Sequence, residues 1–204
     1  RMTEVVVTGI GFASSIGCGR EEVRSSLRDL QHGFSRRRLA GEGIGPELVC
    51  GTVDGFDVSS DDCRDWKFPG SDSLDPGFIR GLPPHGTFAL VAIEEALQLA
   101  ELERNDLNHG QTGLFCASPG SPRQLRHHLN RQAAANWQRA DPMCIVSSIA
   151  GSLNFNLAAL FGITGANCGF VSACTSSSHA LGYAWDEIAL GRQERMLVAS
   201  AEDG

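Results

Sequence analysis

Cys174 is the residue whose surroundings best suit nucleophilic chemistry. It lies in the segment Val171-Ser172-Ala173-Cys174-Thr175-Ser176-Ser177-Ser178, where an apolar run gives way to small residues. We expect a strand to end at the rim of a sheet, a tight turn to hold the thiol, and a buried helix to start directly afterwards, as in a nucleophile elbow. The free N–H groups and positive dipole end of that helix would stabilise thiolate over thiol. The segment therefore predicts an activated cysteine nucleophile. The alternative is a structural cysteine at a strand–helix junction.

The histidines of the chain offer Cys174 no obvious acid–base partner. His179 follows it by about one and a half helical turns, so helix geometry alone does not bring the imidazole over the sulfur. We expect His179 to pack or to bond to the backbone. The vicinal pair His127-His128 lacks partners at zinc-ligand spacing and is expected on a solvated helix face. The remaining histidines are expected in loops: His32, His85 and His109. The sequence therefore predicts no zinc site.

Composition and charge exclude several classes of protein. The formal net charge is -7, which argues against nucleic acid as the main partner. No apolar run reaches the ~18 residues of a membrane span, and the first residues lack the layout of a signal peptide. The seven cysteines include no CxxC pair, which is typical of reduced thiols, most of them in the core. We therefore expect a cytoplasmic protein with no membrane partner.

Alternating apolar segments would position the cysteine. Strands are expected at Val5–Thr8, Gly113–Ala117, Ala166–Ala173 and Arg195–Ala201. Helices are expected at Arg20–Leu30, Thr87–Leu102, Gln124–Arg139, Pro142–Phe161 and Ser176–Leu190, with Gly162 and Gly165 ending the fourth. This alternation predicts an α/β fold with a mixed, mostly parallel sheet.

Two segments depart from this pattern. Residues 31–84 are rich in Gly, Asp, Ser and Pro, carry the basic cluster Arg36-Arg37-Arg38, and contain one expected short strand at Leu48–Val53. We interpret them as an irregular insertion that covers the fold. The turn Gly9-Ile10-Gly11 follows the first strand, but Ser14 stands where a dinucleotide fingerprint has its third glycine, so nucleotide binding is disfavoured.

The cysteine segment, continued through His179-Ala180-Leu181-Gly182, resembles the active-site segment of β-ketoacyl-acyl carrier protein synthases, which belong to the thiolase superfamily. Similar matches run along the whole chain. They are Val5-Val6-Val7-Thr8-Gly9-Ile10-Gly11, residues 157–167 (Leu-Ala-Ala-Leu-Phe-Gly-Ile-Thr-Gly-Ala-Asn), Gly191-Arg192, and residues 196–203 (Met-Leu-Val-Ala-Ser-Ala-Glu-Asp).

This resemblance implies a thiolase-like fold and a two-step reaction. An acyl chain would move from an acyl carrier protein to Cys174, and malonyl-carrier protein would then lose CO2 and condense with the thioester. The Cys174 backbone N–H would form half of an oxyanion hole. The resemblance implies no metal and no organic cofactor beyond the phosphopantetheine arm of the carrier protein. The family's catalytic histidines and lysine lie in its C-terminal half, which nothing here matches, so Cys174 alone is carried over as catalytic.

The resemblance also implies partners. The family fold has two pseudo-symmetric halves in an αβαβα layering, and residues 1–204 match the N-terminal half, so we expect a complementary half or subunit to complete it. A homodimer of complete units is expected, paired through the strand at 166–171. Basic residues would dock the acidic carrier protein, although solvated surface charge is the alternative for each of them: Arg80, Arg123, Arg126 and Arg139.

Two other functions remain open. Another thiolase-like acyltransferase would use the same cysteine for different chemistry. A non-catalytic partner subunit of the chain-length-determining type would usually lack the cysteine, so Cys174 argues against it. The sequence does not define the acyl chain length or the pathway, although Ser118-Pro119-Gly120 and the 143–155 helix are expected to line the pocket.

Overall fold

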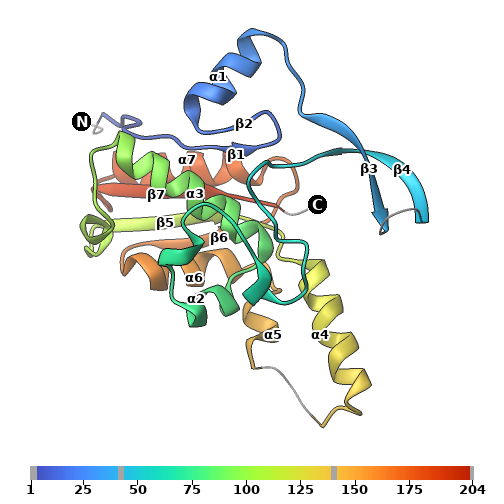
Figure 1. Ribbon diagram of the computed structural model, residues 1–204. Coiled ribbons are helices and arrows are strands. Elements are labelled where there is room, and N and C mark those ends of the chain that lie inside the picture. The colour runs from blue at the N-terminus through green and yellow to red at the C-terminus, as the bar shows by residue number, and fades with distance from the viewer. Residues whose placement is uncertain (1–3, 41–43, 139–141, 203–204) are drawn as a thin grey trace.

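The centre of the molecule is a three-stranded parallel sheet with the order β6-β5-β7. The computed structural model describes residues 4–40, 44–138 and 142–202. The strands are β5 (Thr112–Ala117), β6 (Asn167–Phe170) and β7 (Arg195–Ser200) (Figure 1). Leu114 of β5 pairs with Asn167 on one side and with Leu197 on the other. The predicted strands at 113–117 and 195–201 are confirmed within one residue at each end, whereas the strand expected at 166–173 is shorter, because β6 ends at Phe170.

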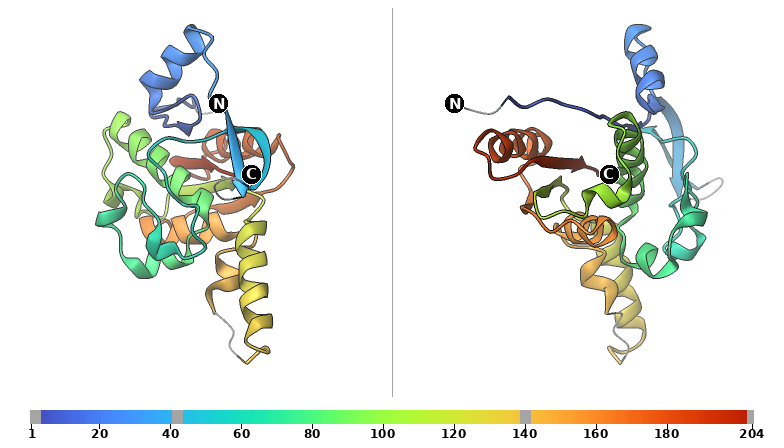
Figure 2. Two further views of the ribbon diagram at one scale, coloured as in Figure 1. Left: turned by 45° about the vertical axis from the view of Figure 1, so that its right-hand side comes forward. Right: turned by 90° about the vertical axis from the view of Figure 1, so that its left-hand side faces the viewer.

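Helices pack on both faces of this sheet. α3 (Pro84–Leu99) and α6 (Ser152–Phe161) contact one face, and α7 (Ser176–Ala189) contacts the other (Figure 2). Side chains of β5 alternate between the two cores, because successive residues of a strand point to opposite faces. Leu114 and Cys116 belong to the α3–α6 core, whereas Phe115 and Ala117 pack against α7. The α/β prediction with a mostly parallel sheet is therefore confirmed.

The N-terminal segment differs from its prediction. Residues 4–12 form no strand, and Val6 and Val7 are 68% and 78% exposed, so the expected strand at Val5–Thr8 is wrong for the described chain. An apolar run alone does not make a strand; it also needs a neighbour for its backbone groups. Two short antiparallel strands follow, β1 (Ala13–Ser14) and β2 (Gly17–Cys18). They lead into the expected first helix, α1 (Arg20–Arg28).

Residues 31–84 contain more regular structure than their composition suggested. β3 (Phe34–Ala40), which carries the three arginines, pairs with β4 (Ile44–Gly51) as an antiparallel ribbon. Short helical turns follow, namely η1 (Cys63–Asp65), η2 (Ser71–Ser73) and α2 (Pro76–Gly81). Trp66, Phe68 and Leu74 are buried in the α3–α6 core, so this segment contributes part of that core.

The expected helix at 142–161 is wrong, because two helices occupy it. After η3 (Arg104–Leu107) and α4 (Pro122–Ala134), the chain forms α5 (Met143–Val146) and then α6. Serine hydroxyls accompany the break: Ser147 Oγ donates to the Met143 carbonyl at 2.9 Å and Ser152 Oγ donates to the Ile149 carbonyl. Such local bonds compete with helical pairing of the backbone. Gly162 ends α6 with a φ of 62°, as predicted.

Within the described residues, none of the helices has both the length and the apolar character needed to cross a membrane.

Candidate active site

Cys174 lies in the turn between β6 and α7, as the sequence predicts. Ala173, directly before it, has a φ of 52°, a left-handed conformation that a residue with a Cβ seldom adopts. The Cys174 side chain is exposed rather than enclosed in the core. A strained turn that presents an exposed side chain between a strand and a helix has the geometry of a nucleophile elbow.

Hydrogen bonds within the turn hold this strained conformation. Ser176 Oγ donates to the Ala173 carbonyl at 2.7 Å and accepts from the Ser172 backbone N–H at 2.7 Å. Thr175 Oγ1 donates to the Ser172 carbonyl, also at 2.7 Å. The serine and threonine side chains around Cys174 are therefore used to fix the backbone that positions the thiol.

His179 bonds to the same turn from the first turns of α7. Its Nδ1 lies 2.9 Å from Ser172 Oγ, so its partner is a side chain rather than the backbone. The expectation of packing or a backbone bond was therefore incomplete. Through Ser172, His179 helps to hold the turn that precedes Cys174.

α7 is buried on one side only, which corrects the expectation of a buried helix after Cys174. Ala180, Ala184 and Ala189 are buried against the sheet. Leu181 and Trp185, on other sides of the helix, are 56% and 44% exposed. Small residues on the buried face allow close approach to the strands, while the apolar outer face has no cover within the described chain.

A cavity of about 430 Å³ opens beside Cys174, and four other segments line it. They are Gly11–Ser14, the Phe88 and Ala92 side of α3, Ser118-Pro119 after β5, and Ser200–Glu202 after β7. The carboxyl ends of parallel strands β5 and β7 meet at this edge, which is where open α/β sheets place their sites. Of the expected pocket-lining residues, Ser118 and Pro119 contribute to this cavity, but no residue of the 143–155 segment does.

Sequence patterns did not predict that residues 11–14 or α3 lie beside Cys174, although the two glycines of the opening motif were a signal for this packing. A Cβ on Gly9 would lie 2.0 Å from the Ala96 carbonyl oxygen, and one on Gly11 would lie 1.8 Å from that of Ala92. The two glycines thus let the N-terminal segment lie directly on successive turns of α3. Close packing, not phosphate binding, explains the Gly9-Ile10-Gly11 motif.

His85 corrects another expectation, because it lies in the first turn of α3 and is 0% exposed instead of lying in a loop. Its Nε2 is 2.7 Å from Ser118 Oγ, which also accepts from the Gly120 backbone N–H at 3.3 Å. This buried pair fixes the loop that forms one wall of the Cys174 cavity.

All seven cysteines are free thiols, but only Cys116 is buried, so the expectation that most lie in the core is wrong. Burial raises the pKa of the thiols of Cys116, Cys18 and Cys63 above the ordinary value. A raised pKa leaves less thiolate at neutral pH, which makes these three thiols poor nucleophiles. Cys174 instead combines exposure, a cavity and the N-terminal end of a 14-residue helix.

The basic residues expected to dock a carrier protein separate in the structure. Arg123 is partly buried, and its guanidinium donates to the Val58 and Ser60 carbonyls. Arg126 is exposed on α4, and Arg80 lines a different cavity. Arg139 lies outside the described residues.

His128 is 8% exposed and bonds Ser147 Oγ through Nε2 at 3.0 Å, so the solvated-face expectation for this pair is wrong. His127 Nδ1 lies 3.1 Å from an Asp61 carboxylate oxygen. Among the described residues, no group of three or more His, Cys, Asp and Glu side chains is arranged to hold a metal ion.

Comparison with known proteins agrees with this geometry. The family model "Beta-ketoacyl synthase, N-terminal domain" matches residues 2–203. The chain is 28% identical over 204 residues to 3-oxoacyl-[acyl-carrier-protein] synthase 1 of Haemophilus influenzae, covering 99% of this chain and 47% of that protein. The same enzyme of Escherichia coli K12 is 28% identical over 206 residues, with the same coverage of 99% and 47%.

Solved structures share the fold. A type II PKS ketosynthase in complex with its acyl-carrier protein and bound to the hexaketide has a TM-score of 0.76 at 19% identity, covering 100% of this chain and 52% of that chain. The chain spans about half the length of the curated relatives that it matches. Because the family model covers nearly all of its residues, the chain belongs to the β-ketoacyl synthase family, as an N-terminal domain with the thiolase-like fold.

Proposed function

We propose that Cys174 is the acyl-accepting nucleophile of a β-ketoacyl-acyl carrier protein synthase. The observation that carries this proposal is the exposed thiol on a strained elbow, at the start of α7 and at the edge of a cavity. The Cys174 sulfur attacks the thioester carbonyl of an acyl-carrier protein, a new C–S bond forms, and the carrier's thiol leaves with a proton. The Cys174 backbone N–H contributes to the oxyanion hole for this step.

The second half-reaction is a decarboxylative condensation. Malonyl-carrier protein loses CO2, the resulting carbanion attacks the Cys174 thioester carbonyl, a C–C bond forms, and the cysteine thiolate is released. Since no histidine or lysine of the described chain lines the Cys174 cavity, we assign the acid–base role in this step to a complementary C-terminal half or subunit. The exposed apolar side of α7, including Leu181 and Trp185, supports this assignment as a surface for that half.

We further propose a homodimer of complete units that pairs through β6. This strand is at the outer edge of the sheet, and Asn167, Cys168 and Gly169 are exposed. An unpaired edge strand is suited to continuing a sheet across a two-fold axis. Size-exclusion chromatography with light scattering tests this, and a monomeric mass for the complete unit contradicts it.

Acylation of Cys174 is tested by incubation with an acyl-carrier protein or with cerulenin, followed by peptide mass mapping. We expect the added mass on the peptide that contains Cys174, and none in Cys174→Ser. Cys168→Ser is the matched control, because it removes the other exposed thiol and should leave labelling intact. Equal labelling of both cysteines, or no labelling, refutes the proposal. Product analysis with malonyl-carrier protein then separates condensation from other acyl transfer.

A further inference from the structure

One face of α3 is connected to two walls of the Cys174 cavity. His85, Phe88, Ala92 and Glu95 recur along this helix at helical spacing, which places them on the same side of it. Phe88 and Ala92 line the cavity directly, whereas His85 and Glu95 do not. The two outer residues therefore act on the cavity through the segments that they bind.

Glu95 binds the N-terminal segment through two backbone groups. Its Oε2 accepts a hydrogen bond from the Phe12 backbone N–H at 3.0 Å, and its Oε1 accepts one from the Arg20 backbone N–H at 2.5 Å. Within the described residues, neither oxygen is paired with a lysine or arginine side chain. The carboxylate thus links two separate points of the backbone to α3.

The loop between these two points is closed by further bonds. The Gly19 backbone N–H donates to the Phe12 carbonyl at 2.9 Å, and β1 pairs with β2 within the same loop. Gly19 is the N-cap residue of α1 and offers no side chain, so Glu95 accepts the N–H of Arg20, the first residue of that helix. The positive end of the helix dipole also favours a carboxylate at this place. Residues 12–20 are therefore a closed loop that one carboxylate binds to α3.

This loop carries a wall of the candidate site. Phe12, Ala13 and Ser14 line the Cys174 cavity, and Phe12 is the residue whose N–H Glu95 binds. A group that is too wide for the cavity has to displace these residues, which breaks the bond between Phe12 and Glu95. A hydrogen bond to a carboxylate is roughly twice as strong as one between neutral groups. The bond to Glu95 therefore opposes widening of the cavity at this wall.

His85 has the corresponding place at the other end of the same face. Its Nε2 lies 2.7 Å from Ser118 Oγ, and Ser118 lines the cavity. His85 is fully buried, however, so replacing it would also disturb the core. Glu95 is only partly buried, and its carboxylate can be replaced by an amide of the same size. Glu95 is therefore the residue at which the effect of a wall can be separated from that of the core.

We propose that Glu95 is a positioning residue for the Cys174 site. Its carboxylate holds the wall formed by residues 12–14 in place and so limits the width of the group that the sulfur accepts. Where that group is an acyl chain, this inference rests on the function proposed for Cys174. The restriction of the cavity by its wall does not rest on it.

Alkylation by two maleimides with the same reactive group tests the proposal. N-methylmaleimide is narrow and N-cyclohexylmaleimide is wide. The ratio of the wide to the narrow rate at Cys174 is measured in the full-length protein by peptide mass mapping and divided by the same ratio for glutathione. We expect Glu95→Ala, which removes both acceptor oxygens, to raise this normalised ratio about tenfold. Tenfold corresponds to ~1.4 kcal/mol, close to the lower end of what a hydrogen bond to a charged group contributes.

Glu95→Gln is the conservative variant. Its amide keeps the size of the side chain but places a donor where one carboxylate oxygen stood, so one of the two backbone N–H groups loses its acceptor. The normalised ratio should rise in the same direction as in Glu95→Ala and by a smaller factor. In both variants the rate of N-methylmaleimide should stay close to that of the wild type, because a narrow reagent does not displace the wall.

Glu94→Gln is the matched control on α3. Glu94 is the adjacent residue, binds Arg104 Nε at 2.7 Å, and does not line the Cys174 cavity. This variant should keep the wild-type ratio even if it lowers Tm.

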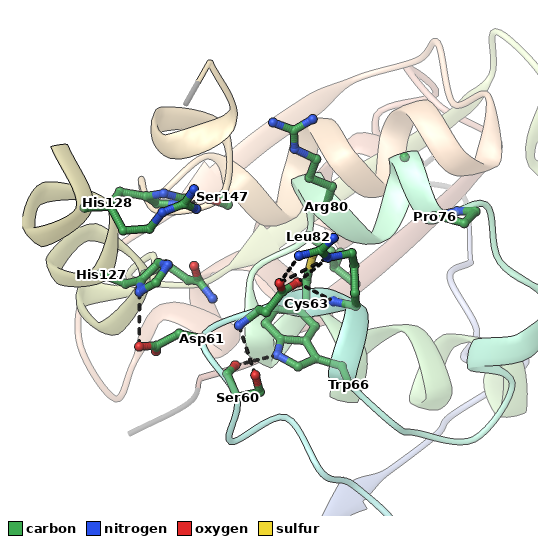
Figure 3. Close-up of a pocket in the computed structure, with 15 residues that line it drawn as sticks. Ser60, Asp61, Cys63, Trp66, Pro76, Arg80, Leu82, His127, His128 and Ser147 are labelled. Atoms are coloured by element: carbon green, nitrogen blue, oxygen red, sulfur yellow. Dashed lines mark hydrogen bonds and ion pairs between the residues drawn. The ribbon is translucent and has the colours of Figure 1, made fainter. Parts of the chain in front are cut away.

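Asp61→Asn is a second control, in a different cavity. Asp61 also joins a loop to a helix, through His127 Nδ1 at 3.1 Å (Figure 3). It lines a cavity of about 780 Å³ between the 60–66 segment, α2 and α4, which shares no lining residue with the Cys174 cavity. Loss of this contact should leave the ratio at Cys174 unchanged.

Several outcomes overturn the proposal. An unchanged ratio in Glu95→Ala, or an equal rise in Glu94→Gln, contradicts it. Equal acceleration of both maleimides also contradicts it, because that reports a more exposed thiol and not a wider cavity. Circular dichroism checks the fold of each variant. If both Glu95 variants unfold while Glu94→Gln folds, Glu95 is needed for folding and not for selectivity, and the proposal fails.

Acyl transfer separates this inference from the function proposed for Cys174. With carrier protein loaded with a butanoyl or a pivaloyl group, the wild type should prefer the linear group, and Glu95→Ala should reduce that preference. If Cys174 accepts neither group but the maleimide ratio rises, the proposed function fails and the role of Glu95 at the wall stands. If Cys174 accepts acyl groups with the same preference in both proteins, and the maleimide ratio is unchanged, the role of Glu95 fails and the proposed function stands.

Discussion

The strained turn at Ala173 predicts that alanine-to-glycine substitutions have opposite effects on the free energy of unfolding at two sites, Ala173 and Ala133. Ala173 has a φ of 52°, and this conformation costs a residue with a Cβ ~1–2 kcal/mol. Glycine avoids that cost but gains conformational entropy in the unfolded chain, which destabilises by roughly 0.5–1 kcal/mol. Ala173→Gly should therefore raise the free energy of unfolding by about 0.5–1 kcal/mol.

Ala133→Gly is the matched control. Ala133 is an exposed residue within α4, where glycine only weakens the helix, by roughly 0.5–1 kcal/mol. The two variants should thus differ by about 1–2 kcal/mol, or roughly 2–8 °C in Tm for a chain of this size. Urea unfolding followed by circular dichroism measures both, and an unchanged m-value confirms that the comparison is valid.

The same variant tests whether the strain serves the thiol. If the strain itself, and not only the left-handed shape, presents the sulfur, Ala173→Gly, which keeps the shape and removes the strain, should slow alkylation of Cys174 by iodoacetamide relative to Cys168, the other exposed thiol of the chain. A decrease in stability of Ala173→Gly similar to that of Ala133→Gly would refute the strain argument. A gain in stability with unchanged Cys174 reactivity would show strain without a role in presenting the thiol.

Three further perturbations follow from the packing. Gly11→Ala should destabilise the contact of the N-terminal segment with α3 by more than ~1 kcal/mol in thermal unfolding, because the Ala92 backbone occupies the place of the new Cβ. Gly110→Ala is the control: a Cβ there meets nothing within 4 Å, so this variant should be neutral or more stable by about 0.4–1 kcal/mol. Since burial raises the pKa of Cys116 above its ordinary value of 9.0, the unfolded chain releases this proton first, and stability should fall as pH rises above about 9. Cys116→Ala should flatten that fall, and an identical pH profile of the variant would contradict the assignment. Arg123→Ala should speed proteolysis of the 56–68 segment, which its guanidinium holds, while the exposed Arg126→Ala should not; equal cleavage rates would argue against this contact.

Hydrophobic periodicity predicted the helices whose apolar residues recur on one buried face. Leu90, Ile93 and Leu97 are buried as one side of α3, as their spacing indicated. The β-branched run at residues 5–7 failed, because a strand also needs a partner for its backbone, and the described chain provides none for this segment. The break between α5 and α6 failed for another reason: the serine hydroxyls that accompany it act through local bonds that hydrophobic patterning does not register.

The place of Cys174 in the fold was predictable, and the surroundings of this cysteine were not. A small-residue turn between a strand and a helix was enough to place Cys174 in an exposed turn. The Phe88 side of α3, the Ser118 loop with its buried partner His85, and residues 11–14 come together only when the chain is folded. Each is far from residue 174 in sequence, and no spacing pattern in the sequence connects it to that residue.

The two glycines of the opening motif connect these observations. Gly9 and Gly11 remove the side chains that would separate the N-terminal segment from α3, and residues 11–14 consequently reach the cavity of Cys174. A larger residue at either position would displace this segment, and the cavity would lose one of its walls although no residue near the sulfur had changed. Position 11 should therefore affect Cys174 through shape alone: Gly11→Ala should alter the relative rates at which small and bulky alkylating reagents modify the thiol. If both rates fall by the same factor, residues 11–14 do not form a wall of the site.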